Sequence, residues 1–273
     1  IEDIRFMNTG EYGGIGALVQ PMEGRMTIVE VYEGYPAHEA GLRPGDIVLD
    51  VDGREVEADM DTEAVSDLLQ GESGSAVTVG IDRPYGGGRL EFEVKRAKVR
   101  IPAVPFSGML DDRTGFIYLS KFTRGSAGEV RKALMALRDS AGMEQLVLDL
   151  RGNGGGLLNE SVSIVNLFVP KGTEIVSTRG KTDKWNKSYT ALGRPTAPDM
   201  PLVVLIDGQS ASASEIVSGT LQDLDRALII GMESFGKGLV QQTKDMAFNT
   251  RLKVTVAKYY TASGRCIQRL DYG

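Results

Sequence analysis

The stretch LVVLIDGQSASASEIVSG, residues 202–219, decides the fold class of the second half of the chain. Residues 202–206 form a short, continuous apolar run, which is typical of a buried strand. A turn that contains three serines follows, and residues 214–224 then have the apolar spacing of a helix. A strand that leads directly into a helix is the repeating unit of an α/β fold.

The same alternation extends over residues 98–273. We expect strands at residues 115–122, 144–152, 202–208, 226–231 and 252–260, and helices at residues 126–142, 157–169 and 214–224. Gly142 closes the first of these helices. The apolar, alternating pattern predicts a mostly parallel sheet covered by helices.

The first part of the chain, about residues 13–97, has a different pattern. Short strands are expected at residues 25–34, 45–56, 75–84 and 89–97, with one helix at residues 61–71 capped by Asp61 or Thr62. Asp52-Gly53 is a hairpin signal. We therefore predict a small β-rich domain with one or two helices, followed by a boundary near residues 97–108.

Composition excludes several functional classes. The chain has 273 residues and a formal net charge of 31 − 37 = −6, without a long basic run, so we expect no nucleic-acid partner. No stretch approaches the ~18 apolar residues of a membrane span. A signal peptide is absent and the chain does not begin with Met, which does not decide its location.

The sequence offers few of the usual partners for a nucleophile. The single cysteine, Cys266, cannot form an internal disulfide, and no histidine lies in the last 230 residues or so to activate it. The single histidine, His38, falls in the β-rich domain, where we expect a surface position. A serine nucleophile in the second half would therefore need a base other than histidine.

Three short motifs match only in part. Residues 231–238, GMESFGKG, resemble a phosphate-binding loop, but Gly238 stands where Ser or Thr would hold Mg²⁺. Ser234 and Lys237 fit S-x-x-K, although the glycines around Lys237 disfavour the helical turn that this motif needs. RGNGGGL, residues 151–157, places Leu157 where a dinucleotide-binding fingerprint requires glycine.

A serine at a strand-to-helix turn has a chemical advantage. Its hydroxyl lies near the unpaired N–H groups and the positive dipole end of the helix, which favour an alkoxide-like nucleophile and a neighbouring oxyanion. Lysine is the best remaining base, but it must lose its proton, and burial against apolar side chains favours the neutral amine. Phe235, Leu239 and Val240 predict such walls beside Lys237. At this point all three serines remain candidates.

The β-rich domain resembles a PDZ domain of the bacterial protease type. The resemblance rests on GGIGALV, residues 13–19, on YPAHEAGLRPGDIVLDVDGREV, residues 35–56, and on the order of the elements. PDZ domains bind the C-terminal carboxylate of a peptide with backbone N–H groups and add the peptide to a sheet edge. The resemblance implies a peptide-binding loop formed by Gly14, Ile15, Gly16 and Ala17.

Three segments occur in a fixed order in the second part: DLRGNGGG, DGQSASASEI and SFGKGLVQ. With them the chain resembles the carboxy-terminal processing peptidases, or tail-specific proteases, of the serine–lysine type. The resemblance implies Ser212 as nucleophile, Lys237 as general base and Gln241 as the residue that orients the lysine. It also implies an oxyanion hole formed by the N–H groups of Gly156 and Ala213, and a crotonase/Clp-protease-like ββα core. No metal or cofactor is needed.

This reading has a checkable geometric consequence. An extended strand would hold Lys237 and Gln241 about 13 Å apart, at ~3.3 Å per residue. Contact between the two side chains therefore requires a helical turn or a bend within residues 236–241. For the domains, we expect an N-terminal linker at residues 1–12, a PDZ domain at 13–97 and a serine protease core at 98–273.

The expected function is a serine endopeptidase that cleaves proteins selected through their C-terminal tails. Its expected partners are protein or peptide substrates with apolar C-termini, while an adaptor protein and a homo-oligomer stay open as further partners. The resemblance implies a bacterial cell-envelope location, periplasmic or extracytoplasmic. Two alternatives stay open: a catalytically inactive PDZ scaffold that binds peptides, and a crotonase-like acyl-CoA enzyme.

Overall fold

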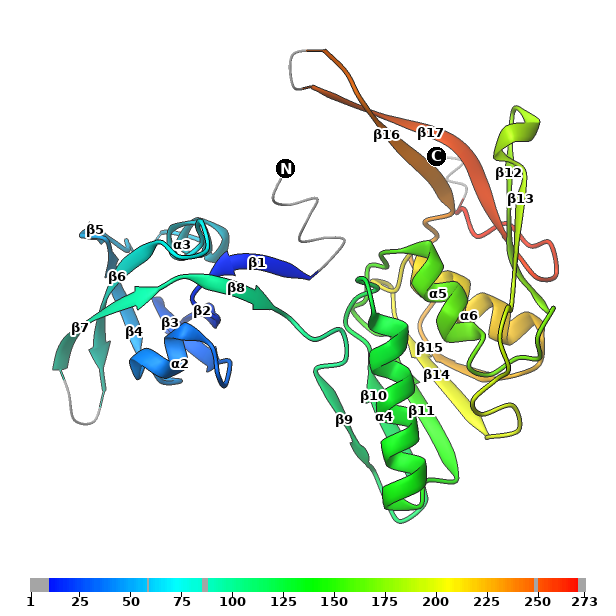
Figure 1. Ribbon diagram of the computed structural model, residues 1–273, viewed down its shortest axis with the longest axis horizontal. Coiled ribbons are helices and arrows are strands. Elements are labelled where there is room, and N and C mark those ends of the chain that lie inside the picture. Colours follow the sequence, from blue (N-terminus) through cyan, green and yellow to red (C-terminus); the bar gives the residue numbers. More distant parts are fainter. Residues whose placement is uncertain (1–9, 58, 85–87, 248–249, 270–273) are drawn as a thin grey trace. The chain divides into compact units, whose positions relative to one another are not determined.

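The structure is a computed structural model that describes residues 10–57, 59–84, 88–247 and 250–269 (Figure 1). Most of the expected linker at residues 1–12 lies outside the described residues. The chain divides into two compact units, one from Glu11 to Ile101 and one from Pro102 onward. Each unit has its own core of buried apolar side chains.

The first unit is a small β-rich domain, as the sequence predicts. Its elements are β1 (Glu11–Gly14), β2 (Ala17–Met22), β3 (Arg25–Val31), α2 (Pro36–Ala40), β4 (Ile47–Val51), β5 (Arg54–Glu55), α3 (Thr62–Leu69), β6 (Ala76–Arg83), β7 (Gly88–Lys95) and β8 (Ala97–Arg100). The main sheet has the order β2-β3-β4-β6-β7, with β5 paired to β4. Strand β2 therefore forms one edge of this sheet.

Local sequence signals in the first unit act as expected. Asp52 and Gly53 both have positive φ, at 51° and 75°, which is the conformation of a tight hairpin turn. Asp61 caps α3 by accepting a hydrogen bond of 2.8 Å from the backbone N–H of Ala64. Helix α3 ends at Leu69, before Gly71, because the Arg96 guanidinium binds its last carbonyl groups.

The boundary between the units falls between Ile101 and Pro102, inside the range of residues 97–108 that the sequence indicates but after the domain bound at residue 97. Strand β8 pairs with β1 in antiparallel register, and Lys98 forms an ion pair of 2.7 Å with Glu11. Residues 98–101 therefore belong to the first unit, whereas the sequence analysis assigned them to the second.

The second unit combines two sheets and three helices. Its elements are β9 (Phe106–Met109), β10 (Thr114–Tyr118), α4 (Ser126–Ala141), β11 (Gln145–Asp149), α5 (Leu158–Val165), β12 (Glu174–Gly180), the 3₁₀ helix η1 (Asp183–Trp185), β13 (Lys187–Thr190), β14 (Leu202–Ile206), α6 (Ala213–Asp223), β15 (Leu228–Gly231), β16 (Leu239–Asp245) and β17 (Arg251–Thr261). The first sheet has the order β15-β14-β11-β10-β9, and all its pairs are parallel except β9–β10. The mostly parallel sheet is thus confirmed.

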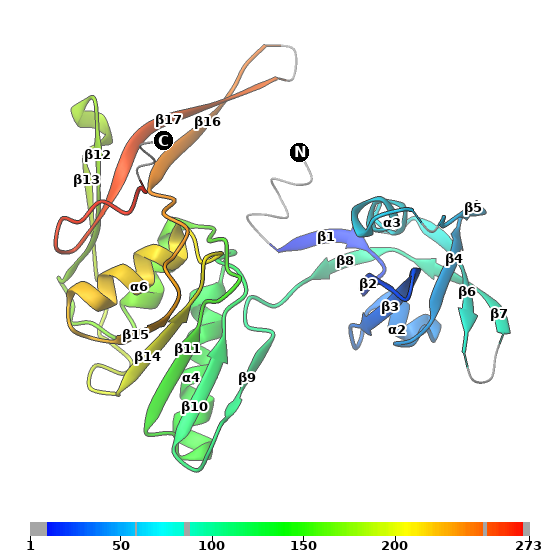
Figure 2. The same cartoon turned by 180° about the vertical axis from the view of Figure 1, so that it is seen from behind.

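The second sheet is antiparallel and was not expected as a whole. Its order is β13-β12-β17-β16, so two hairpins lie side by side through the β12–β17 pair (Figure 2). Helix α6 contacts β15 of the first sheet and β12 and β17 of the second. Helix α6 therefore contacts both sheets.

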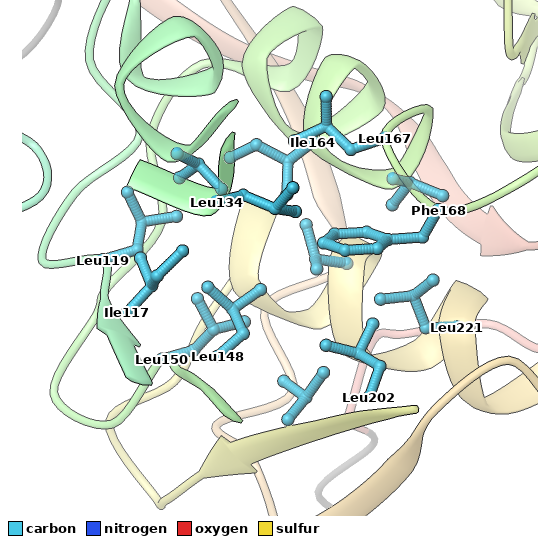
Figure 3. Close-up of a cluster of buried hydrophobic side chains, with 14 of the residues drawn as sticks. Ile117, Leu119, Leu134, Leu148, Leu150, Ile164, Leu167, Phe168, Leu202 and Leu221 are labelled. Carbon is cyan, nitrogen blue, oxygen red and sulfur yellow. The ribbon is translucent and has the colours of Figure 1, made fainter. Parts of the chain in front are cut away.

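The core of the second unit holds the helices on the parallel sheet. Apolar side chains from the strands and from α4, α5 and α6 interlock there (Figure 3). Phe168, Ile117 and Leu148 are fully buried in this cluster. Burial of a leucine-sized side chain contributes about 1.5–3 kcal/mol, so this core fixes the strand ends that carry the loops described below.

Among the described residues, no helix is both long enough and apolar enough to span a membrane.

Candidate active site

Ser212 occupies a strained turn between β14 and α6. Its backbone has φ 56° and ψ −106°, which is a sparsely populated conformation for a residue other than glycine. Such a conformation costs about 1–3 kcal/mol and persists only where the surroundings enforce it. Ala211 N–H donates to Asn153 O (3.1 Å) on one side, and Ser212 N–H donates to the Glu215 carboxylate (2.7 Å) on the other.

The three serines of the turn differ in their hydrogen bonds. Ser210 and Ser214 are fully buried, and their hydroxyl groups donate to Leu150 O and Asn153 O at 2.8 Å each. Ser212 is half-buried; its hydroxyl oxygen faces the Glu215 N–H in a capping box, and its hydroxyl group donates a hydrogen bond to none of the residues that the structure describes. Of the three hydroxyl groups, only that of Ser212 remains available for chemistry.

One buried carboxylate links this turn to the loop that carries Lys237. Glu215 is 4% exposed. One of its oxygens accepts from Ser234 Oγ (2.8 Å) and Gly236 N–H (2.6 Å), and the other accepts from Ser212 N–H (2.7 Å) and Lys237 N–H (2.8 Å). Hydrogen bonds to a charged group contribute about 1.5–3 kcal/mol each, so Glu215 fixes both segments relative to each other.

Lys237 lines an open pocket of about 510 Å³. The lining includes Ala211, Phe235, Leu239, Gln241 and Gln268. Lys237 is exposed, and its amine makes no hydrogen bond within the described part of the chain, either to Ser212 or to Gln241.

The predicted apolar burial of Lys237 is therefore wrong for this structure. Phe235, the largest of the expected walls, is 57% exposed, and Leu239 and Val240 are only half-buried. The physical reason is that the loop is held through its backbone. The side chains on either side of Lys237 are therefore not forced against the amine.

Lys237 and Gln241 line the same pocket. Strand β16 begins only at Leu239, and its pairing with β17 is shifted by an irregularity between Val240 and Gln241. The pairing skips Val256, so the extra residue of this irregularity lies in β17 and not within residues 236–241, where no helical turn forms. Contact between the Lys237 and Gln241 side chains therefore stays a prediction, although both residues line this pocket.

The glycine-rich loop after β11 packs against the serine turn. A Cβ on Gly155 would lie 2.6 Å from Ala211 O and 2.9 Å from Ser212 Cβ. A Cβ on Gly156 would lie 2.4 Å from Phe122 O, and both glycines have positive φ. Only glycine fits at either position.

Free backbone donors lie in these segments. Gly155 N–H donates to Asn153 Oδ1 (2.9 Å), whereas Gly156 N–H and Ala213 N–H have no acceptor among the described residues. The fully buried Asn153 also donates its side-chain amide to Leu119 O (2.7 Å), which fixes the loop. Unpaired N–H groups beside a nucleophile are what an oxyanion hole requires.

Charged side chains organise the strand ends around the loop. Asp207 accepts hydrogen bonds from the N–H groups of Gly152 and Gln209, and the bond from Gly152 is the largest factor that lowers the Asp207 pKa below its usual value. Arg151 binds the buried Asp149 carboxylate through two of its nitrogens. Both aspartates therefore hold the glycine-rich loop against β11 and β14.

The partial motifs have structural explanations. Strand β16 follows GKG, where a phosphate-binding loop would have a helix. Ser234 and Lys237 lie in a segment without regular structure, and the Ser234 hydroxyl group is used by Glu215. His38 is exposed in α2, where its Nδ1 accepts from Gly34 N–H at 3.4 Å, and Cys266 is a half-buried free thiol.

A second pocket, of about 140 Å³, lies in the first unit. Ile15 and Ala17 line it, together with Tyr12, Ser66, Leu69 and Ile101. Gly14 ends β1 and Gly16 has φ +79°, so the Gly14–Ala17 loop turns sharply into the edge strand β2. Burial raises the pKa of the Tyr12 hydroxyl, which stays neutral at the pocket wall.

The sequence reasoning missed several residues that shape the site. Glu215, Asn153 and Asp149 are buried polar groups that hold its loops. The pattern Ser212-x-x-Glu215 before an apolar helix is a capping-box signature, so Glu215 could have been found. Asn153 and Asp149 carry no comparable signal.

Comparisons with known proteins agree with this geometry. The model of peptidase family S41 matches residues 113–271, and a PDZ domain model matches residues 27–83. The chain therefore belongs to peptidase family S41.

Two curated relatives are similar to almost the whole of this chain. The chain is 36% identical over 270 residues to a carboxy-terminal-processing protease of Bartonella bacilliformis, and 34% identical over 261 residues to a probable CtpA-like serine protease of Staphylococcus aureus. The alignments cover 98% and 95% of this chain. The chain spans only 61% and 51% of the lengths of these relatives.

Solved structures show the same mixed α/β architecture. The photosystem II D1 C-terminal processing protease is 32% identical, with a TM-score of 0.57, and the match covers 97% of this chain and 72% of that one. A putative S41 protease from Bacteroides fragilis has a TM-score of 0.62 at 19% identity, covering 93% of this chain and 72% of that one, and so supports the fold alone.

Proposed function

We propose that this chain is the catalytic part of a serine endopeptidase that uses a Ser212–Lys237 dyad. The observation that carries the proposal is the joint placement of the two residues by Glu215. That carboxylate binds the N–H groups of both Ser212 and Lys237, and of the three serine hydroxyl groups in the turn only that of Ser212 donates no hydrogen bond to a described residue. Family membership supports the same reaction class.

The proposed reaction is acyl transfer in two steps. Ser212 Oγ attacks the peptide carbonyl carbon, its proton passes to Lys237 Nζ, and the C–N bond breaks as that proton is delivered to the leaving amine. Water then attacks the ester carbonyl carbon and gives a proton to Lys237, and the C–Oγ bond breaks as that proton passes to Ser212 Oγ, which leaves the new carboxyl group on the product. The N–H groups of Gly156 and Ala213 stabilise the oxyanion of each tetrahedral intermediate.

The exposed position of Lys237 assigns a role to the substrate. A lysine can act as a general base only with a neutral amine. A polypeptide seated in the 510 Å³ pocket would displace water from the amine and favour its neutral form. In this proposal Gln241, which lines the same pocket, orients the lysine once substrate is bound.

The first unit is proposed as the domain that selects the substrate. A peptide would add to the free edge of β2, its terminal carboxylate would bind N–H groups of Gly14–Ala17, and its last apolar side chain would enter the 140 Å³ pocket. This assigns the first unit as a PDZ domain and the second unit as a protease core of the crotonase/Clp-like ββα type. A cell-envelope location belongs to the same proposal, and its test is fractionation of cells.

A cleavage assay tests the proposal against its alternatives. Unfolded proteins ending in apolar residues should be cleaved by the wild type and not by Ser212→Ala or Lys237→Ala. An inactive scaffold would bind the tail peptide without cleaving any substrate. An acyl-CoA enzyme would show binding of acyl-CoA by calorimetry, which we expect to be absent.

A further inference from the structure

The loop that carries Lys237 is held on two sides. It spans residues 234–238 and has no regular secondary structure. On one side, Glu215 binds the N–H groups of Gly236 and Lys237, and Ser210 O accepts from Phe235 N–H at 3.0 Å. These bonds do not involve the Lys237–Gly238 peptide group, which is held by a different segment.

The second side is formed by residues 265–269, which we call the return segment. After β17 the chain folds back: Ile267 N–H donates to Tyr259 O (3.3 Å), and Arg269 N–H donates to Gly236 O (2.9 Å). Gln268 contributes the remaining contact, because its Oε1 accepts from Gly238 N–H at 3.0 Å. Glu215 and Gln268 are thus the two side chains that bind backbone N–H groups of the lysine loop.

Close packing shows that the return segment and the loop are built for each other. A Cβ on Gly236 would lie 2.3 Å from Arg269 Cβ, and a Cβ on Gly238 would lie 2.3 Å from Gln268 N. Real Cβ contacts do not approach this closely, so glycine is needed on both sides of Lys237. The G-K-G pattern therefore has a structural cause in addition to any chemical one.

The amide of Gln268 is oriented by two bonds. While Oε1 accepts from Gly238, Nε2 donates to Arg269 O at 2.8 Å. The side chain is half-buried and lines the same pocket as Lys237 and Gln241. It therefore presents a neutral group, in a fixed orientation, to the pocket that contains the amine.

We propose that Gln268 is a positioning residue for Lys237. It fixes the Lys237–Gly238 peptide and thereby the direction in which the lysine side chain leaves the backbone. It must also be uncharged, because a carboxylate in this pocket would favour the charged ammonium over the neutral amine that acts as base. This inference rests on the proposed dyad.

Three variants of the full chain test it. Gln268→Met keeps the length of the side chain and removes the hydrogen bond. Gln268→Glu keeps the acceptor for Gly238 N–H, removes the donor to Arg269 O and adds a charge. Gln242→Glu is the matched control, since Gln242 is exposed on β16 outside the pocket. For each variant, kcat and KM for an unfolded protein ending in apolar residues would be measured from pH 5 to 10.

The expected results distinguish a residue that positions Lys237 from one that only stabilises the fold. Gln268→Met should lower kcat about tenfold, the size of one lost hydrogen bond, with KM within twofold. Gln268→Glu should move the pH of half-maximal kcat upward by about one unit or more, because an opposite charge stabilises the ammonium. Gln242→Glu should keep the wild-type profile. If Gln268→Glu only lowers the plateau and leaves the half-maximal pH in place, the inference is overturned.

A second readout keeps the inference separate from the proposed function. Amide hydrogen exchange of Gly238 should be at least tenfold faster in Gln268→Met than in the wild type, because its acceptor is removed. An unchanged exchange rate would overturn the inference even in an active enzyme. If the wild type cleaves nothing, the proposed function fails by itself, and exchange still decides whether Gln268 holds the loop.

Discussion

Replacing Glu215 by glutamine nearly preserves the shape of the side chain but removes two acceptors. The carboxylate accepts from four donors, two on each oxygen. An amide can accept on its oxygen, but its NH₂ group must face the other two donors, so two hydrogen bonds are lost. At about 1.5–3 kcal/mol for each bond to a charged group, Glu215→Gln should cost about 3–6 kcal/mol.

This cost should appear partly as lost stability and partly as lost activity. We expect a clear fall in the urea concentration at the midpoint of unfolding, and at least a hundredfold fall in kcat among the molecules that remain folded, because displacing a catalytic group by about 1 Å can cost that much. Urea unfolding followed by tryptophan fluorescence, together with steady-state cleavage corrected for the folded fraction, measures both effects.

Glu160 provides the matched control. It is a partly buried carboxylate that caps α4 by accepting from the N–H groups of Gly125 and Ala127 at 2.9 Å each. Glu160→Gln should lower the unfolding midpoint without changing kcat for the folded molecules. If Glu215→Gln kept kcat within twofold of the wild type, or if Glu160→Gln lowered kcat equally, Glu215 would not hold the dyad together.

Three further predictions concern neighbouring groups. Gly155→Ala should destabilise the fold by several kcal/mol and abolish cleavage, because its Cβ would lie 2.6 Å from Ala211 O, whereas Gly154→Ala meets nothing within 4 Å and should leave the thermal midpoint unchanged. Asp207 has a lowered pKa in the folded state, so its stabilising effect is complete above the unfolded pKa of ~3.9 and is lost as the pH falls through the lower folded pKa. Asp207→Asn should therefore reduce the loss of unfolding free energy between pH 5 and pH 2, measured by urea unfolding. An unchanged loss of stability over this pH range would contradict this role. A tail peptide with an amidated C-terminus should bind the first unit at least tenfold more weakly by calorimetry than the free acid, since the Gly14–Ala17 loop would lose its charged partner; equal binding would rule out carboxylate recognition there.

Long, periodic elements could be predicted well from the sequence. Helix α4 was expected at residues 126–142 and forms at Ser126–Ala141, ended by Gly142 in the left-handed conformation. Strand β14 and helix α6 begin within a residue of their expected positions. In each case apolar periodicity and cap residues favour the same answer, and tertiary contacts do not oppose it.

The second sheet could not be predicted in the same way. Strand β16 contains Gln241, Gln242 and Thr243, and it is mostly exposed, so it lacks the apolar alternation that marks a half-buried strand. It forms a strand because it pairs with β17, and its own residues carry no local signal for that pairing. Strand β8 likewise forms only because β1 pairs with it.

The identity of the candidate nucleophile could be predicted from the sequence, because the chemistry requires a particular residue type. The burial of the site residues could not be predicted, because it depends on tertiary packing. Ser212 follows from its place at a strand-to-helix turn together with the family pattern. The exposure of Lys237 does not follow, because apolar neighbours in sequence need not cover a side chain when the loop is held through its backbone. The role of Gln268 could not be predicted from the sequence, since it depends on a chain reversal after β17 that no local signal indicates.

The central claim is that Ser212 is the nucleophile and Lys237 its base, and covalent trapping tests it most directly. The protein would be mixed with an activated ester of an apolar acyl group, quenched with acid, and examined by intact mass and peptide mapping. We predict one acyl group on Ser212, none in Ser212→Ala, and much slower acylation in Lys237→Ala. Acylation at Ser210, Ser214, Ser234 or Cys266 instead, or an acylation rate unaffected by Lys237→Ala, would contradict the account.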